Sequence, residues 1–205
     1  MTEPTAPLLR TAHTYQLAPA DLDEIRAFLY AAFEGEYSDE DWDHGLGGIH
    51  AYVRDGSGIL AHGSVVQRRV VLAGRSYRIG YVEAVAVRAD RRREGLGGRV
   101  MAALEQVVDG AYAFAALSAS EAGVALYAGR GWRMWPGRIA VQGPRGIERL
   151  PEEEGSAYVR GVAGGNLPAP AGDLSAVGTG LPSGPGEASA DSGTLVFDWR
   201  DGDVL

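Results

Sequence analysis

The sequence predicts an α/β fold with a central mixed, mostly antiparallel sheet that carries helices on both faces. Three observations lead to this prediction. The apolar run 81–87 predicts a buried strand, and a basic, glycine-rich turn separates it from an apolar-periodic helix over 95–108. A second apolar run, 111–117, follows that helix and completes a strand–loop–helix–strand unit. Turn signals elsewhere separate further strands of ordinary length.

Two helices are expected before the long strands. Residues 21–33 carry apolar side chains at helical spacing, and Asp21 with Glu24 has the spacing of a capping box. Ser38 with Asp41 marks the start of a second, short helix. The strands expected next, joined by glycine-containing turns, cover residues 50–54, 59–72 and 76–87.

Helices and strands are also expected after the turn. Leu96, Val100 and Leu104 would face the core from the helix 95–108. A further helix is expected over 121–129, and strands over 111–117, 132–135, 139–142, 157–162 and 194–199. Segment 164–193 is rich in Gly, Pro, Ala and Ser and has no basic residue, which is typical of a disordered insert. The length fits a single domain over residues 1–205.

Composition excludes several kinds of chemistry. The 205 residues contain neither Cys nor Lys, so disulfides, thiolate zinc sites, a cysteine nucleophile and a Schiff-base lysine are impossible. The four histidines show no metal-ligand spacing, and only His62 is expected to be half-buried. The net charge of −8 argues against nucleic acid as a partner. No apolar run approaches the ~20 residues that span a bilayer, and no secretory signal is apparent, so a cytoplasmic protein without membrane contact is expected.

The turn after the long strand has the composition of an anion-binding loop. Arg92, Gly95 and Gly97 follow the pattern R-x-x-G-x-G between a strand and a helix. Glycines let backbone amides close around an anion, the helix N-terminus adds a positive dipole, and arginines add charge. The alternatives are a glycine-rich helix start without a ligand, and a Rossmann loop, which would need G-x-G-x-x-G. The turn favours a phosphorylated cofactor.

Acidic residues form three clusters along the chain. They are Glu34, Glu36, Asp39, Glu40, Asp41 and Asp43; Glu152, Glu153 and Glu154; and Asp198, Asp201 and Asp203 with the terminal carboxylate. Each cluster taken alone is typical of a solvated surface or a helix start. Three clusters beside a cofactor loop also fit a subsite for a polycationic ligand.

Three side chains outside the turn are candidates for chemistry. Glu83 lies inside an apolar strand, where it faces either a cleft, as a base for an ammonium substrate, or an arginine in a structural ion pair. Tyr127 is either a core aromatic or an acid, because a phenol suits protonation of a thiolate of comparable basicity. Ser118 ends a predicted strand and is either a ligand at a cleft or a helix cap.

The turn matches the pyrophosphate loop of the GNAT N-acetyltransferases, [RQ]-x-x-G-x-[GA], and Tyr127 lies in their Y-x-x-x-G-[FWY] context. The whole chain resembles the aminoglycoside 2′-N-acetyltransferases of that superfamily from about Ala20 to Leu205, apart from segment 164–193. The strings that carry this resemblance are DWDHGLGGIHA, AHGSVVQRR, GYVEAVAVRAD, ALSAS, LYAGRGW, PEEEG and the ending DWRDGDVL.

The resemblance implies the GNAT fold and a homodimer that transfers acetyl from acetyl-CoA to the 2′-amine of an aminoglycoside, a small polycationic amino sugar. It implies cofactor contacts from Val85, Val87, Arg92, Arg93, Gly95, Leu96, Gly97 and Gly98. It implies substrate contacts from Glu36, Asp41, Ser118, Glu153, Asp203 and Leu205. Glu83 would be the base, through water, and Tyr127 the acid; the terminal carboxylate is the alternative base.

The chain also departs from the family pattern. Glu36 and Glu153 stand where the family has aspartates, and Leu205 stands where a tryptophan can occur. These differences concern the drug range more than the type of reaction. Two other functions stay open, namely a GNAT enzyme for another amine (a polyamine, a cell-wall amino sugar or a protein N-terminus) and a non-catalytic acyl-CoA-binding module. The presence of Glu83 and Tyr127 argues against the second.

Overall fold

The computed structural model describes residues 6–167 and 193–202. The α-helices are α1 (Pro19–Ala32), α2 (Asp39–Gly45), α3 (Leu96–Ala111) and α4 (Val124–Ala128). The strands are β1 (Leu8–His13), β2 (Ile49–Asp55), β3 (Gly58–Leu72), β4 (Arg75–Val87), β5 (Phe114–Ser118), β6 (Arg133–Met134), β7 (Arg138–Gly143), β8 (Gly146–Arg149), β9 (Ala157–Gly161) and β10 (Thr194–Asp198). Residues 168–192, most of the predicted insert 164–193, lie outside the described residues.

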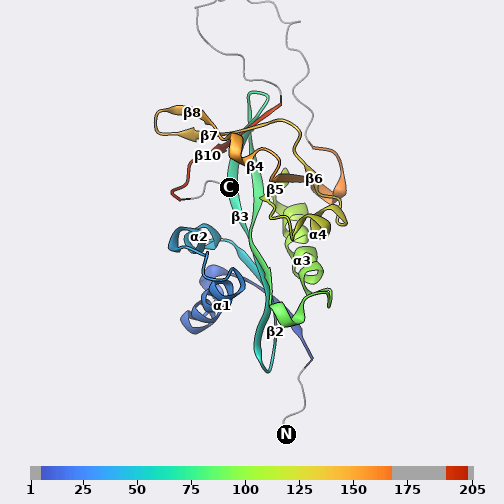
Figure 1. The fold of residues 1–205 in the computed structure, drawn as a ribbon. Helices are drawn as coiled ribbons and strands as arrows, with labels where there is room; N and C mark the ends of the chain where they lie inside the picture. Colours follow the sequence, from blue (N-terminus) through green and yellow to red (C-terminus); the bar gives the residue numbers. More distant parts are fainter. Residues whose placement is uncertain (1–5, 168–192, 203–205) are drawn as a thin grey trace, which may run out of the picture.

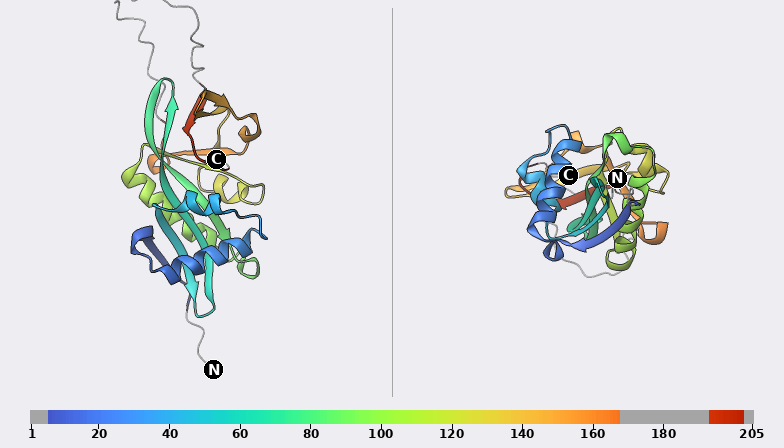
Figure 2. Two further views of the ribbon diagram at one scale, coloured as in Figure 1. Left: turned by 90° about the vertical axis from the view of Figure 1, so that its left-hand side faces the viewer. Right: turned by 90° about the horizontal axis from the view of Figure 1, so that it is seen from below.

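The ten strands form one sheet in the order β6-β9-β5-β4-β3-β10-β7-β8, with β2 joined to the side of β3 and β1 joined to β2. Helices α1 and α2 cover one face of the sheet, and α3 and α4 cover the other (Figure 1). The view from below separates the same two layers (Figure 2). Among the described residues, only β4–β5 and β10–β7 pair in parallel. The predicted α/β fold with a mixed, mostly antiparallel sheet is confirmed.

The two helix layers bury different parts of the apolar sequence. Helix α3 places Val100, Leu104 and Val108, all fully buried, against the sheet. Helix α1 buries Ile25 and Leu29 completely on the opposite face. Each side chain of this size contributes ~2 kcal/mol when it leaves water, so both layers are held by apolar burial. Within the described residues, no helix is long and apolar enough to cross a membrane.

Two helix starts show how local chemistry sets the boundaries. Helix α1 begins at Pro19 without a side-chain cap, so the capping box predicted for Asp21 and Glu24 is wrong. Those two carboxylates instead contact the guanidinium of Arg54, at 3.5 and 3.1 Å. The helix start predicted at Ser38 and Asp41 is confirmed, and it has the form of a capping box. Ser38 Oγ accepts a hydrogen bond from the Asp41 amide at 3.0 Å, and the Asp41 carboxylate accepts one from the Ser38 amide at 2.8 Å.

Several boundaries differ from the prediction. Helix α3 continues to Ala111, so the strand predicted over 111–117 begins only at Phe114, and the helix predicted over 121–129 covers only Val124–Ala128. The strands β1 and β8 were not predicted. Both lie at edges of the sheet, where half-exposed backbone and polar side chains such as those of GIER give no apolar run to recognise.

The histidines are more buried than predicted. His62 and His50 are each 1% exposed and His44 is 9% exposed, whereas only His62 was expected to be half-buried and the others were expected at the surface or in turns. His50 and His62 lie on the adjacent strands β2 and β3 and share one sheet face, which the helical layer covers. His44 lies on α2, and its ring contacts the Asp201 carbonyl oxygen. Strand periodicity alone does not reveal which face will be covered.

Candidate active site

The sheet opens at the middle of β4. Strands β4 and β5 pair at only two positions in the described residues, Gly80 with Ala115 and Tyr81 with Ala116. Beyond Tyr81 the two parallel strands diverge, although β4 continues to Val87. A β4 edge that has lost its neighbour presents backbone N–H and C=O groups to which an extended ligand can bind as an additional strand.

A β-bulge lies at the same point of β4. The pairing with β3 runs Ser64 with Glu83 and then His62 with Ala86, so β4 has one residue more than β3 across this step. Ala84 has φ +50, a left-handed conformation that is uncommon for a residue with a Cβ. Such bulges bend a strand and change the direction of its side chains, and they are frequent beside active sites.

The cofactor loop follows β4 directly. Arg93 and Gly95 both have positive φ, at +67 and +76, which turns the chain sharply into the start of α3. Gly97 lies at a close contact, because a Cβ there would come within 3.3 Å of the Val87 and Leu126 side chains. The loop therefore presents the N-terminal amides of a sixteen-residue helix next to the end of β4, which is a common anion-binding arrangement.

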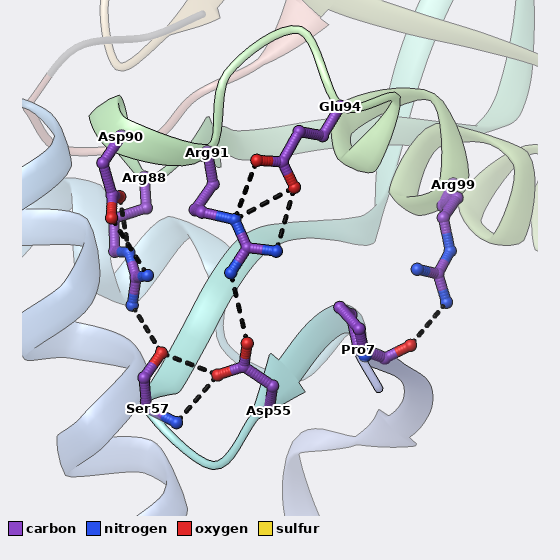
Figure 3. Close-up of polar contacts among 8 residues, drawn as sticks. All are labelled: Pro7, Asp55, Ser57, Arg88, Asp90, Arg91, Glu94 and Arg99. Atoms are coloured by element: carbon purple, nitrogen blue, oxygen red, sulfur yellow. Dashed lines mark hydrogen bonds and ion pairs between the residues drawn. The ribbon is translucent and has the colours of Figure 1, made fainter. Parts of the chain in front are cut away.

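The arginines of the loop have two different roles. Arg91 contacts Asp55 at 3.2 Å and Glu94 at 2.9 Å, and Arg88 contacts Asp90 at 2.7 Å (Figure 3). Arg88 also donates to Ser57 Oγ at 2.9 Å, so both side chains fasten the loop to the β2–β3 turn. Arg92 and Arg93 are exposed, and no ion pair is found for either among the described residues.

Glu83 projects toward the layer of α1 and α2, where it forms an ion pair with Arg200. The two side chains are only 15% and 16% exposed. Tyr37, between α1 and α2, lies nearby: burial, followed by the charges of Glu83 and Asp41, raises the pKa of its hydroxyl. Of the two interpretations of Glu83 from the sequence, the structure therefore shows the ion pair. A role as base requires Arg200 to give way.

Unsatisfied polar atoms gather around Glu83. In the described part of the chain, four buried side-chain polar atoms have no hydrogen-bond partner. Three of them belong to neighbours of Glu83: Ser64 is opposite it on β3, Tyr81 precedes it by two residues, and Arg200 is its ion-pair partner. Buried polar groups are paired in the great majority of cases, so such a group of exceptions marks a place built for polar chemistry.

Tyr127 approaches the opening from the other face. It lies on α4, is 7% exposed, and belongs to the apolar cluster beneath α3 that also contains Val82. Its ring packs beside Trp132 and Tyr158, at centroid distances of 6.2 and 6.5 Å. Burial raises the pKa of its hydroxyl to about 12, so the group stays protonated at neutral pH.

Ser118 and Glu153 lie at the same end of the β5–β9 pair. Ser118 is the last residue of that strand and pairs with Ala157 on β9. Glu153 ends a 3₁₀ turn just before β9, and its carboxylate accepts a hydrogen bond from Ser156 Oγ at 3.0 Å. Burial raises the pKa of the Tyr81 hydroxyl, and among the smaller contributions is the charge of Glu153, so this carboxylate lies on the side of β4. Both residues therefore border the opening between β4 and β5.

Two of the three acidic clusters line one cavity of about 570 Å³ beside Arg200. The acidic residues that line it are Asp39, Glu40 and Asp43 from α2, Asp198 at the end of β10, and Asp201 from the segment after it. Residues 152–154 of the middle cluster do not line this cavity, and Glu154 pairs with Arg149 at 2.8 Å. Glu36 is exposed in the turn before α2, and the Asp41 carboxylate is used in the capping box. Asp203 and Leu205 lie outside the described residues.

The end of β10 and the segment after it are held at the site by contacts that the sequence patterns did not reveal. The buried guanidinium of Arg68, 1% exposed, contacts the Asp198 carboxylate at 2.8 Å and stacks on Tyr81 at 4.9 Å. The Asp201 carbonyl oxygen lies 2.7 Å from His44 Nε2. Arg68 and Arg200 occur within the strings AHGSVVQRR and DWRDGDVL. The family resemblance was therefore the sequence feature that could have pointed to these two arginines.

Two diverging strands, a bulge and a glycine-rich helix start define an acetyltransferase of the GNAT class. Residues 14–135 match the acetyltransferase (GNAT) domain family, and the chain belongs to this family. Within it, the chain belongs with the aminoglycoside 2′-N-acetyltransferases. It is 41% identical over 196 residues to the aminoglycoside 2′-N-acetyltransferase of Mycolicibacterium fortuitum, and the match covers 95% of this chain and 90% of that protein.

Solved structures show the same fold at lower identity. The Escherichia coli N-acetyltransferase YhbS, solved in complex with CoA, has a TM-score of 0.54 and 18% identity, covering 77% of this chain and 82% of that one. Escherichia coli ElaA has a TM-score of 0.53 and 13% identity, covering 75% and 99%. At these identities the similarity concerns the fold alone.

Proposed function

We propose that this chain transfers the acetyl group of acetyl-CoA to the 2′-amino group of aminoglycosides, by direct attack of the amine in a ternary complex. One observation carries the proposal. The opening between β4 and β5 has Glu83 on one face and Tyr127 on the other, and the acidic cavity adjoins the partner of Glu83. A polycationic aminoglycoside and the anionic acetyl-CoA would therefore meet in this opening, with Glu83 as the base and Tyr127 as the acid.

The residues present fit acetyl-CoA. Acetyl-CoA supplies the acetyl group as a thioester. The backbone of Val85 and Val87 lies on the free edge of β4, where it can pair with an extended pantetheine arm. The pyrophosphate would be held by the loop residues Arg92, Arg93, Gly95, Leu96, Gly97 and Gly98, whose amides can donate hydrogen bonds to it and whose two exposed guanidinium groups would balance its charge.

The acceptor site would be acidic. Carboxylates attract the several ammonium groups of an aminoglycoside through the summed field of the cleft as well as through direct contacts. The cavity between α2 and the segment after β10 would hold one part of the drug. Contacts to the ring that carries the reacting amine are proposed for Glu36, Asp41, Ser118, Glu153, Asp203 and Leu205.

Proton transfer would use the two faces of the opening. An ammonium group of the drug would compete with Arg200 for Glu83, and the carboxylate released from Arg200 would then accept the proton of the attacking amine, through water. Tyr127, protonated because of its burial, would donate a proton to the sulfur of CoA as it leaves. Backbone amides beside Val85 would polarise the thioester carbonyl. No step needs a covalent enzyme intermediate.

We also propose the setting in which the enzyme works. The absence of Cys in the sequence and the requirement for acetyl-CoA favour the cytoplasm. A homodimer is proposed on the strength of the family resemblance. The assignment of a single domain over 1–205 also remains a prediction.

The position of acetylation tests the proposal. The protein would be incubated with acetyl-CoA and tobramycin, which carries a 2′-amine among several amino groups, and the product would be located by two-dimensional NMR. The expected product carries one acetyl group on the 2′ nitrogen. Acetylation at another amino group would assign a different regiochemistry, and no product would mean that the acidic cavity serves another amine.

A further inference from the structure

A chain of buried hydrogen bonds ends at the bulge of β4. Thr14 Oγ1 lies 2.9 Å from His50 Nε2, and His50 Nδ1 lies 3.0 Å from His62 Nε2. His62 Nδ1 lies 3.2 Å from the carbonyl oxygen of Ala84, the bulge residue. Both imidazoles are 1% exposed, and neither has a part in the proposed acetyl transfer.

Geometry and burial together fix the direction of the bonds between the rings. A carbonyl oxygen only accepts, so His62 Nδ1 carries the hydrogen. Burial lowers the pKa of His62 to about 3 and that of His50 to about 4, so both rings are neutral at pH 7 and His62 Nε2 accepts from His50 Nδ1. His50 Nε2 is then an acceptor for the hydroxyl of Thr14, whose oxygen also lies 3.3 Å from a second acceptor, the Gly48 carbonyl oxygen.

The bulge decides which way the side chains of the site point. In a regular strand Val82 and Val85, three residues apart, would face opposite sides of the sheet. Here both pack in the cluster beneath α3, while Ala84 packs on the α1 side, toward which Glu83 also projects. If the bulge were lost and β4 became a regular strand, the side chains of Val85 and Val87 would move to the same face of the sheet as Glu83.

We propose that His62 is a positioning residue that holds the Ala84 peptide in its left-handed conformation, and that this keeps Glu83 and the free edge at Val85 in register for acetyl transfer. Ala84 is not a glycine, so its conformation needs support from its surroundings. The bond from His62 supplies that support from within the sheet, on the strand that pairs with β4. This inference rests on the proposed acetyl transfer.

Two substitutions separate positioning from simple structural support. In His62→Asn, the amide nitrogen takes the place of Nδ1 and can still donate to Ala84, but the acceptor for His50 is lost. In His62→Gln, a polar group reaches the place of Nε2, but the donor to Ala84 is lost. Each variant leaves one buried polar group without a partner, so their losses of stability should be similar. Thr14→Val, at the far end of the chain of bonds, is the control.

The expected result is a difference in turnover at matched stability. His62→Gln should have a kcat about tenfold or more below that of His62→Asn, with melting temperatures and KM for the drug that are alike, whereas Thr14→Val should keep kcat within about twofold of wild type. Equal kcat values for the Asn and Gln variants would overturn the inference.

Hydrogen exchange gives a second readout that needs no acetyl acceptor. Ala86 pairs with His62 directly after the bulge, so the exchange rate of its amide reports the local register. We expect exchange at Ala86 to be about tenfold faster in His62→Gln and little changed in His62→Asn. Equal exchange in the two variants would refute the role of His62, whereas a wild-type protein that is inactive on aminoglycosides would refute the proposed function alone.

Discussion

Replacement of Tyr127 by phenylalanine separates its chemistry from its packing. The side chain is 7% exposed, and its ring is fixed between Trp132, Tyr158 and the backbone at Gly123, where an added Cβ would come within 2.6 Å of the ring. Phenylalanine preserves all of this packing. No hydrogen bond to the Tyr127 hydroxyl is found within the described residues, so its removal should change the free energy of unfolding by less than ~1 kcal/mol.

The effect on turnover should be much larger. General acid catalysis contributes roughly 10²–10⁴-fold, so Tyr127→Phe should lower kcat by about 10² or more, which corresponds to ~3 kcal/mol in the barrier. Because the pKa of Tyr127 is about 12, the ratio of wild-type to variant rates should stay constant from pH 7 to pH 10. The assay is CoA release, with the affinity for acetyl-CoA measured by calorimetry as a control. A variant with wild-type kcat would remove Tyr127 from the mechanism.

Three further predictions follow from charges and burial. Arg200→Met should lower the free energy of unfolding by roughly 3 kcal/mol, because it leaves Glu83 buried without its ion-pair partner. The double variant Arg200→Met/Glu83→Gln should lose less than the sum of the losses of the two single variants. Additive losses in urea denaturation would show that the ion pair is absent in solution. Burial lowers the pKa of His62 to about 3 and that of His50 to about 4 in the folded protein, below the unfolded value of about 6.5. The unfolded chain therefore binds more protons than the folded one between pH 6.5 and 4, so the free energy of unfolding should be highest above pH 6.5 and fall by several kcal/mol toward pH 4. A free energy of unfolding that does not change between pH 7 and 4.5 would contradict this. Arg92→Gln should weaken acetyl-CoA binding about three- to tenfold at low salt and less at high salt, with kcat little changed; calorimetry at two salt concentrations that finds equal affinity would exclude a phosphate contact.

The fold could be predicted because its signals are local. The run Tyr81–Val87, the glycine-rich turn and the periodic helix after it are contiguous, and together they specify the strand–loop–helix unit at the centre of the sheet. Glu83 was recognisable for the same reason, since a carboxylate inside an apolar run is conspicuous. The edge strands β1 and β8 gave no such contrast with their surroundings.

The partners of the site residues could not be predicted because they come from distant parts of the chain. Arg200 is 117 residues from Glu83, and Arg68 is 130 residues from Asp198. No periodicity connects such pairs. The bulge was hidden for a different reason. The residues that follow Glu83, 84–87, are apolar on both faces of the strand, so their pattern is compatible with either register. Only the pairing with β3 shows the extra residue.

The positions of the acidic clusters could be predicted only in part from the charge pattern. The clustering of carboxylates along the sequence favoured an acidic subsite, and residues of two of the three clusters do line one cavity. It could not indicate that Glu154 would pair with Arg149, whereas the role of Asp41 at the start of α2 was predicted from its spacing to Ser38. At these positions a hydrogen-bond or ion-pair partner close in the sequence binds the carboxylate.

The measurement that tests the central claim most directly is CoA release by thiol titration with a pair of drugs, which a cysteine-free enzyme leaves without background from its own side chains. Tobramycin carries a 2′-amine, whereas kanamycin A carries a 2′-hydroxyl. We predict rapid CoA release with tobramycin and none above background with kanamycin A. Equal release with both drugs, or release with neither, would contradict 2′-N-acetylation as the activity of this site.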